Sequence, residues 1–510
     1  MFQQIKRLGT DTAIYGVSTI IGRFLNFLLV PFYTNVLMPG DYGVVTYMYS
    51  LIAFVTVIYS YGMESAFFKY SSTLEIGTPR QNFSTPFLSL FGTSILFSTI
   101  LVLLTTPISH AIHLPEQYSN IMVYAAGILA FDAMAIIPFA ALRMERNAKK
   151  FAAIKFLNIF INVVMNIVLL VVLKRGIEGI FISGLTASIL TFVMLLPTIA
   201  RHFTAAFNKD LVRALLKFGL PFIPAGLATM AVQVIDRPIL RALTDDATVG
   251  IYQANYRLGI FMMLVVSMYD YAWRPFYFSI AKQPDAKEIF ARVLTYLLLV
   301  MSGIFLVLTF FLKDVVSISF FGKHLIHPDY WGGLNIVPVV LLGYMFLGVS
   351  TNLSAGIYIE KKTHYLPPNT FVGAAVNVAA NYFLIPSMGM MGAAWATFFA
   401  YFVMAAMLYV VVQRVYPIRY EFDRLAKIGV ATGAVTGLYY FFNGGVFPTF
   451  SSASVVFFKI GLLAIFLLLM YYMRFFEGKE LAILKRLVRK PGMVSPPTPE
   501  SEPPLEEHGV

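Results

Sequence analysis

Long apolar segments recur along this 510-residue chain and decide what it can fold into. Each is about 20–30 residues long, which is enough to cross a bilayer as an α-helix. The runs are too continuous for the alternating strands of a membrane barrel. A spanning helix also satisfies every backbone hydrogen bond within its own segment. We therefore expect an all-α polytopic membrane protein.

The composition agrees with this expectation, because 58% of the residues are hydrophobic and only 13% are charged. An ordinary soluble protein carries roughly 25% charged residues. The apolar runs predict 14 transmembrane helices, at residues 11–37, 41–68, 82–108, 119–142, 151–173, 177–200, 212–240, 247–275, 288–312, 334–358, 366–386, 389–413, 425–443 and 453–475. The connecting loops are short, so no soluble domain is expected between the helices.

The lysines and arginines are distributed unevenly between the two sets of loops. With these 14 helices, 28 of the 38 basic residues fall on one side, five fall on the other and five lie within spans. Basic residues concentrate in cytoplasmic loops, so the bias predicts that both termini are cytoplasmic. The net charge of +12 is then a consequence of topology, and we expect no nucleic-acid partner.

The two halves of the chain resemble each other. The matched positions are Glu145 with Glu360, Asn162/Asn166 with Asn377/Asn381, and Gly43 with Gly250. Corresponding helices are six apart and point the same way, which predicts a parallel repeat of two six-helix lobes. The expected domains are an N-lobe (1–208), a C-lobe (209–420), two appended helices (421–476), and a basic interfacial segment with a disordered tail (477–510).

Charged residues lie inside several of the apolar segments. A charge at mid-bilayer costs roughly 2.5–3.5 kcal/mol, so such residues usually face a cavity and have a function. The candidate substrate-binding residues are Arg23, Arg237, Arg257 and Arg274, with Asn26 and Gln253 as polar neighbours. Arginine suits a phosphate because its planar fork bonds two oxygens and keeps its proton when buried. The pattern therefore predicts a cationic lumen for an anionic cargo.

The intramembrane acids Glu64, Asp132, Asp236 and Asp270 are candidates for charge pairing or for ion coupling. Asp236 cannot share a helical face with the adjacent Arg237, so we expect its partner on another helix. The asparagine stripes are expected to join helices by hydrogen bonds. Pro221 and Pro224, beside Gly219, are expected to kink the seventh span.

No catalytic constellation is visible in the sequence. It contains no phosphate-binding loop, no nucleophile elbow, no zinc-binding helix motif and no cysteine, and its loop histidines lack metal-ligand spacing. A polytopic polymerase or ligase would need a large polar external loop, which is absent. We therefore expect no catalytic residue, no metal, no cofactor and no enzymatic activity.

Local patterns carry a family resemblance over about residues 5–475. They are GMESAFFKY (62–70), LRMERNAKKF (142–151), GLPFIPAGLA (219–228), IDRPIL (235–240) and VGIYQANYRL (249–258). In this order and spacing they resemble the polysaccharide transporter family, the O-antigen and capsule repeat-unit flippases of the multidrug/oligosaccharidyl-lipid/polysaccharide exporter superfamily. The resemblance implies a bacterial cytoplasmic (inner) membrane protein.

The resemblance also implies the cargo and the partners. The cargo would be an undecaprenyl-pyrophosphate-linked glycan, moved from the cytoplasmic to the periplasmic leaflet by alternating access. The expected partners are membrane lipids, with a polysaccharide polymerase and glycosyltransferases as further candidates. Two alternatives stay open: a flippase for a lipid II-type peptidoglycan precursor, and a cation-coupled multidrug antiporter. The antiporter would need lumen acids for organic cations, so an arginine in the first span argues against it.

Overall fold

The computed structural model describes residues 22, 27–320, 322–445, 452–478 and 480, almost all of them in helices. The chain divides into two compact units, residues 1–421 and 422–510. Among the described residues, 12 helices are long and apolar enough to cross a membrane, or 13 if one bent pair counts as a span. The all-α polytopic architecture is thereby confirmed. The predicted first span lies largely outside the described residues, and the count of 14 and the topology stay predictions.

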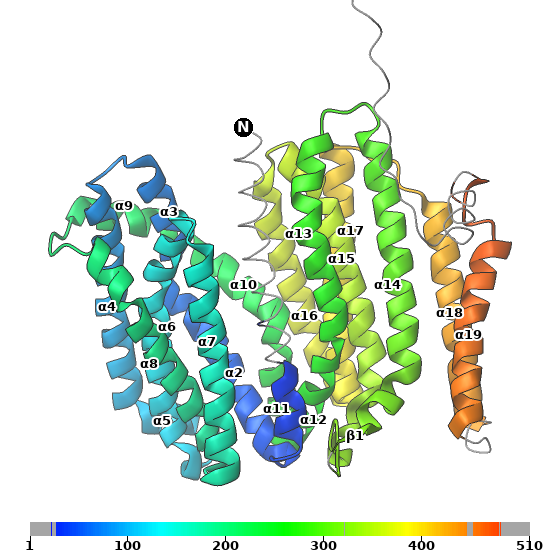
Figure 1. Ribbon diagram of the computed structural model, residues 1–510, viewed down its shortest axis with the longest axis horizontal. Coiled ribbons are helices and arrows are strands. Elements are labelled where there is room, and N and C mark those ends of the chain that lie inside the picture. The colour runs from blue at the N-terminus through cyan, green and yellow to red at the C-terminus, as the bar shows by residue number, and fades with distance from the viewer. Residues whose placement is uncertain (1–21, 23–26, 321, 446–451, 479, 481–510) are drawn as a thin grey trace, which may run out of the picture. The chain divides into compact units, whose positions relative to one another are not determined.

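The first part of unit 1 is a bundle that begins with helical residues 27–34. Its members are packed on one another, with α6 contacting α4 and α8, and α7 contacting α8 (Figure 1). The elements are α2 (Pro39–Ser60), α3 (Met63–Thr73), α4 (Pro79–Leu103), α5 (Thr105–Ala111), η1 (Glu116–Tyr118), α6 (Asn120–Met144), α7 (Ala148–Ile167), η2 (Val168–Val172, a π-helical turn) and α8 (Gly176–His202).

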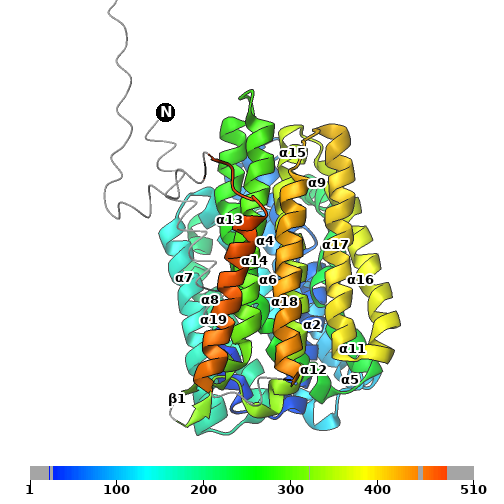
Figure 2. The ribbon, with the colours of Figure 1, turned by 90° about the vertical axis from the view of Figure 1, so that its right-hand side faces the viewer.

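The second part of unit 1 is another bundle, in which α17 packs on both α15 and α16 (Figure 2). Its elements are α9 (Lys209–Gly219), α10 (Phe222–Val234), α11 (Asp236–Leu243), α12 (Asp246–Tyr256), η3 (Arg257–Gly259), α13 (Ile260–Ile280), α14 (Ala286–Ser317), β1 (Ser319–Phe320), β2 (Lys323–His324), η4 (Pro328–Ile336), α15 (Val337–Ile359), η5 (Thr363–Tyr365), α16 (Leu366–Met388) and α17 (Met390–Val415). β1 and β2 form an antiparallel hairpin.

The predicted kink in the seventh span is confirmed, because α9 and α10 meet at an angle of 40°. Pro221 cannot donate a backbone hydrogen bond, so the helical ladder is interrupted after Gly219. The sequence boundary at 208/209 assigns α9 to the second lobe, yet α9 packs on α3 and α4. Its Leu211 and Leu215 are fully buried in a core shared with Met63 and Leu90.

Helix starts in unit 1 follow local sequence signals. Thr78 and Gln81 form a reciprocal capping box at the start of α4. Asn208 caps α9 and Asp245 caps α12, each accepting a hydrogen bond from a backbone N–H three residues later. Such caps stabilise a helix by about 1 kcal/mol. They fix where the helices that position the site begin.

Unit 2 contains α18 (Phe422–Gly445) and α19 (Ser452–Tyr472), which pack on each other. Arg424 is buried near the start of α18. Its guanidinium Nη2 lies 3.1 Å from Glu480 Oε2 and its Cζ lies 4.5 Å from the ring centre of Phe475. The pair joins the start of α18 to the segment that follows α19. The predicted basic interfacial segment and tail lie mostly outside the described residues.

Candidate functional site

A cavity with a volume of about 830 Å³ lies in unit 1. Its walls come from helices of both bundles, mainly α2, α6, α7 and α8 on one side and α10–α12 on the other. The charged side chains in the lining are Arg143, Lys155, Arg237 and Arg257 against Glu64 and Asp132. Basic side chains therefore outnumber acidic ones in the described lining of the cavity.

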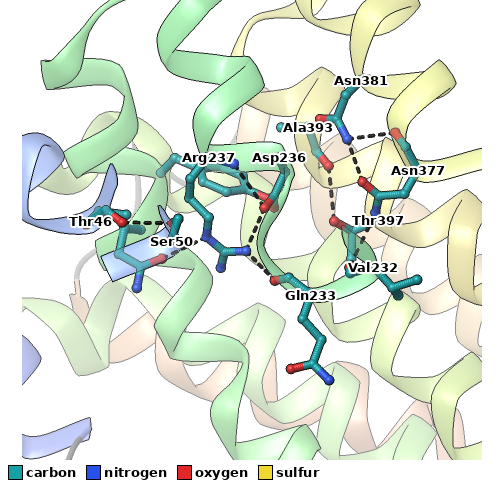
Figure 3. Close-up of polar contacts among 12 residues, drawn as sticks. Thr46, Ser50, Val232, Gln233, Asp236, Arg237, Asn377, Asn381, Ala393 and Thr397 are labelled. Atoms are coloured by element: carbon teal, nitrogen blue, oxygen red, sulfur yellow. Dashed lines mark hydrogen bonds and ion pairs between the residues drawn. The ribbon is translucent and has the colours of Figure 1, made fainter. Parts of the chain in front are cut away.

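Arg237 is held rigidly in the wall of this cavity. Its Nη1 lies 2.6 Å from Asp236 Oδ1 and donates to the Gln233 carbonyl at 2.5 Å (Figure 3). Its Nε donates to Gln253 Oε1 at 3.2 Å, and its guanidinium stacks over the Tyr256 ring at 4.3 Å. Both members of the ion pair are buried. Most of the donors of Arg237 are thus committed inside the protein.

The expectation that Asp236 pairs with a residue of another helix is wrong in part. Adjacent residues do leave a helix on different faces, but Arg237 is long enough to fold back onto its neighbour. Asp236 also anchors the backbone N–H of Arg237 at 3.0 Å. Its second oxygen accepts a hydrogen bond from Tyr252 on α12 at 2.6 Å. Asp236 therefore joins α11 to α12 through a tyrosine.

Arg257 differs from Arg237 in its surroundings. It begins the short η3 turn and its side chain is exposed to the cavity. No hydrogen bond or ion pair links its guanidinium to any residue in the described part of the chain. An arginine that keeps its donors free inside a cavity is available to an anionic ligand. Gln253 lies one helical turn earlier and also lines the cavity.

The wall of the cavity opposite Arg237 and Arg257 carries two basic and two acidic side chains among the described residues. Arg143 forms an ion pair with Glu64, and Lys155 lies 4.3 Å from the ring centre of Phe139. Asp132 accepts a hydrogen bond from Ser188 at 2.7 Å. Arg143 and Lys155 lie near the ends of their predicted spans, where basic residues usually belong to loops. Their position in the cavity depends on helix rotation, for which the sequence has no clear signal.

Three of the predicted substrate-binding residues are not placed at this site by the described part of the chain. Arg23 and Asn26 lie outside the described residues. Arg274 is exposed on α13 and its Nη2 lies 2.9 Å from Asp270 Oδ2, one helical turn away. Neither Arg274 nor Asp270 lines the cavity. Their roles in binding or coupling stay predictions.

The asparagines form the same local arrangement in both bundles. The Nδ2 of Asn166 donates to the Asn162 carbonyl at 2.8 Å, and Asn381 does the same to Asn377 at 2.8 Å. Asn166 also accepts from Tyr33 at 3.1 Å, and Asn377 donates to the carbonyl of Val232 at 3.5 Å (Figure 3). The asparagine-to-asparagine bonds lie within one helix, whereas the bonds to Tyr33 and to Val232 link neighbouring helices. Asn158 similarly joins α7 to Thr191 of α8 at 2.8 Å.

The cavity is closed at one end by contacts between the two bundles of unit 1. The α2 and α12 backbones cross so tightly that a Cβ added at Gly43 would lie 1.7 Å from the Asp246 carbonyl oxygen. A Cβ added at Gly250 would lie 2.0 Å from the carbonyl oxygen of Pro39. We call this crossing the glycine seam; it lies at the lower end of Figure 1. Glycine is required here because any side chain would collide with backbone.

Hydrogen bonds surround the glycine seam. Arg241 donates to the carbonyls of Ile112 at 2.8 Å and His113 at 2.9 Å. Tyr330 donates to the Leu37 carbonyl at 2.9 Å. Asn35 donates to the carbonyl of His324 at 2.9 Å. All of these bonds join the first bundle to the second, so they would have to break for the lobes to part at this end.

The arrangement is suited to binding an anion and to a movement of the lobes. Among the described residues, no cluster of three or more histidine, aspartate or glutamate side chains could hold a metal ion. The cavity offers Arg257, which has no hydrogen-bond or ion-pair partner among the described residues, together with a buried ion pair and several tyrosines.

Comparison with known proteins gives a family match over part of the chain and a likeness in fold over most of it. The model of the family described as "Polysaccharide biosynthesis protein" matches residues 34–273. No curated protein sequence matches the chain. A solved structure of the lipid II flippase MurJ in an inward closed conformation is similar, with a TM-score of 0.71 and 16% identity over 94% of this chain and 100% of that chain.

Two further solved structures have a related fold. One is an inward-facing multidrug resistance MATE family transporter of the MOP superfamily, with a TM-score of 0.59 and 12% identity over 77% of this chain and 94% of that one. The other is a MOP superfamily transporter from Pyrococcus furiosus, with a TM-score of 0.56 and 12% identity over 80% of this chain and 95% of that one. Residues 34–273 thus match the polysaccharide biosynthesis protein family, and the chain is similar in its polytopic all-α fold to the MurJ and MATE transporter structures.

Proposed function

We propose that the chain is a flippase for an undecaprenyl-pyrophosphate-linked oligosaccharide, such as an O-antigen, capsule or exopolysaccharide repeat unit. In this proposal it works in the bacterial inner membrane and moves the cargo from the cytoplasmic to the periplasmic leaflet by alternating access. The observation that carries the proposal is Arg257, exposed to an 830 Å³ cavity without a partner among the described residues. The polysaccharide biosynthesis family supports a glycan as the cargo.

The charge of the cavity favours a phosphate-bearing head group. Among the described residues, four basic and two acidic side chains line it. Arg143 is paired with Glu64 and Arg237 with Asp236, which leaves Lys155 and Arg257 against Asp132. A pyrophosphate carries about two negative charges, and an inside-negative potential favours their outward movement by about 2.3 kcal/mol per charge per 100 mV. An organic cation would be repelled by this excess of basic side chains, which argues against the multidrug antiporter.

Flipping in proteoliposomes tests this function. Wild type and Arg257→Ala would be compared with a fluorescent undecaprenyl-pyrophosphate oligosaccharide, with Arg175→Ala as the control in an exposed loop. A charged hydrogen bond is worth about 1.5–3 kcal/mol, so we expect transport by Arg257→Ala to fall at least tenfold. Arg23→Ala and Arg274→Ala would test the remaining arginine predictions. Failure of wild type to move the cargo would contradict the proposal.

A lipid II-type precursor is the second candidate cargo. It is favoured by the similarity in fold to the lipid II flippase, which extends over 94% of the chain. The same liposomes loaded with a lipid II-type pyrophosphate would compare the two head groups directly. Preference for the peptidoglycan precursor would replace the leading proposal.

Ion coupling through Glu64, Asp132, Asp236 or Asp270 is a separate hypothesis. All four have a partner in the structure: Arg143, Ser188, Arg237 and Arg274, respectively. Charge pairing accounts for Glu64, Asp236 and Asp270 without coupling. Amide substitution of each acid, followed by transport at several pH values, tests coupling; unchanged rates and pH profiles would remove that role.

A further inference from the structure

A second cavity of about 380 Å³ lies within the second bundle, between α10, α13, α15, α16 and α17. We call it the tyrosine pocket, because Tyr256, Tyr344 and Tyr401 line it, together with Gln233, Thr370 and Met404. The large central cavity has its own, separate set of tyrosines. Nothing in the proposed transport of a pyrophosphate requires this second space.

The three tyrosines form a continuous aromatic wall. The ring centres of Tyr256 and Tyr344 lie 6.1 Å apart, and those of Tyr344 and Tyr401 lie 6.2 Å apart. Gly259 permits this packing, since a Cβ there would lie 3.1 Å from the Tyr344 ring. The rings are buried in the bundle.

The chemistry of the pocket suits a neutral, hydroxyl-rich ligand. No acidic side chain from the described residues lines it. Aromatic rings offer apolar faces with a polar edge, and Gln233 can both donate and accept. The Gln233 side chain points away from the Asp236–Arg237 pair (Figure 3), and its amide has no hydrogen-bond partner among the described residues. A sugar ring presents a C–H face to an aromatic ring and hydroxyls to an amide.

The tyrosine pocket adjoins the central cavity at the arginines. Val234, Arg237 and Arg257 line both spaces. A phosphate bound at Arg257 therefore lies at the entrance of the tyrosine pocket. In a lipid-linked glycan the first sugar is bonded directly to the phosphate. The sugar nearest the phosphate is then the part of the cargo that can reach the tyrosines.

We propose that the tyrosine pocket is a sugar-binding subsite, which takes glycan residues adjacent to a phosphate held at Arg257. The proposal rests on the flippase function and adds a site for the part of the cargo that carries no charge. Discrimination between glycans would arise here, because Arg257 contacts only the phosphate that all such cargoes share. Filling the pocket should weaken glycan recognition and leave phosphate recognition intact.

The experiment compares two probes, undecaprenyl pyrophosphate without sugar and the same lipid carrying an oligosaccharide. Binding to purified wild type is compared with binding to Met404→Trp, which places an indole in the tyrosine pocket. Met268→Trp is the matched control, because Met268 is 54% exposed on α13 and lines none of the three cavities. If Met404→Trp does not fold, the binding of the two probes is compared in Tyr344→Phe and Tyr401→Phe instead.

We expect wild type to bind the glycan probe more tightly than the sugar-free probe. Met404→Trp should weaken glycan binding about tenfold and change sugar-free binding less than twofold, while Met268→Trp changes neither. Equal affinity of wild type for the two probes, or equal weakening of both by Met404→Trp, would overturn the sugar subsite alone. Failure of wild type to bind either probe would overturn the proposed function and the subsite with it.

Discussion

Arg237 and Arg257 line the same cavity, but their guanidinium groups differ in pairing and in exposure. Arg237 is neutralised by Asp236 at 2.6 Å and is buried, whereas Arg257 is exposed to the cavity. A buried ion pair contributes little net stability, but removal of one partner leaves an uncompensated charge. We infer that Arg237 shapes the wall and that Arg257 is the group available to cargo.

The buried Asp236–Arg237 ion pair should matter for the stability of the fold. Asp236→Asn should destabilise the protein strongly, because breaking a buried pair costs about 3–5 kcal/mol. The double variant Asp236→Asn/Arg237→Gln should recover much of the loss, since neither charge is then left alone. Thermal unfolding in detergent measures both. Asp270→Asn is the control, because its partner Arg274 is exposed and such a pair is worth about 0.3–0.5 kcal/mol. Equal losses for the single and double variants would contradict this account.

Residues differ in how far the sequence reveals their place in the site. Arg237, Arg257 and Gln253 could be predicted to line a lumen, because a charge inside an apolar run needs a polar surrounding. Lys155 could not, since a basic residue near a helix end usually lies in a loop. The pairing of Asp236 was also beyond sequence reasoning, because it depends on how a long side chain folds back.

At the scale of the helix, the breaks were partly predictable. Gly219 and Pro221, at the junction of α9 and α10, predicted the 40° bend. The break between α2 and α3 carried a weaker signal, a single Gly62 with φ +69°. A Cβ there would lie 2.3 Å from the Gly219 carbonyl oxygen, so the two breaks pack on each other. Apolar patterning predicts that a span exists, and a proline can predict where it bends; the weaker break at Gly62 depends on tertiary packing.

The element-scale prediction concerns the glycine seam. Gly250→Ala should prevent the close crossing of α2 and α12, because its Cβ would overlap the Pro39 carbonyl oxygen at 2.0 Å. We expect the population to shift toward states in which the seam is open, with transport reduced several-fold. The accessibility of Asn35→Cys to a membrane-impermeant thiol reagent measures opening, in a chain that has no native cysteine.

Gly40→Ala is the matched control for the seam. Gly40 lies on the same helix, three residues before Gly43, and a Cβ there would meet nothing within 4 Å. Its labelling and transport should match those of the parent Asn35→Cys protein. If Gly250→Ala also labels like the parent while remaining folded, the seam does not hold this end closed.

At the scale of the whole of unit 1, the bonds that join the bundles are concentrated at one end. Tyr330–Leu37, Asn35–His324 and the Arg241 contacts all lie beside the glycine seam. Each neutral hydrogen bond contributes about 1 kcal/mol net, so the set can be broken and remade at modest cost. A carrier that alternates between two states needs contacts of this strength.

The last prediction is that fixing this end closed stops transport. A bifunctional thiol reagent that joins Asn35→Cys to His324→Cys would bridge the two bundles across the Asn35–His324 hydrogen bond of 2.9 Å. We expect glycan flipping to be abolished while binding of the sugar-free probe persists, because the cavity itself is unchanged. Cleavage of the bridge with a reductant should restore flipping.

The control bridge joins two residues of a single bundle. Asn120 on α6 donates to Glu178 on α8 at 3.3 Å, so Asn120→Cys/Glu178→Cys places a bridge of similar span within the first bundle. Rigid-body movement of the lobes leaves that distance unchanged, and flipping should survive. If the 35–324 bridge forms fully and transport continues, the lobes do not need to part at the glycine seam. The cargo would then have to leave by a lateral route, and alternating access would be the wrong mechanism for this chain.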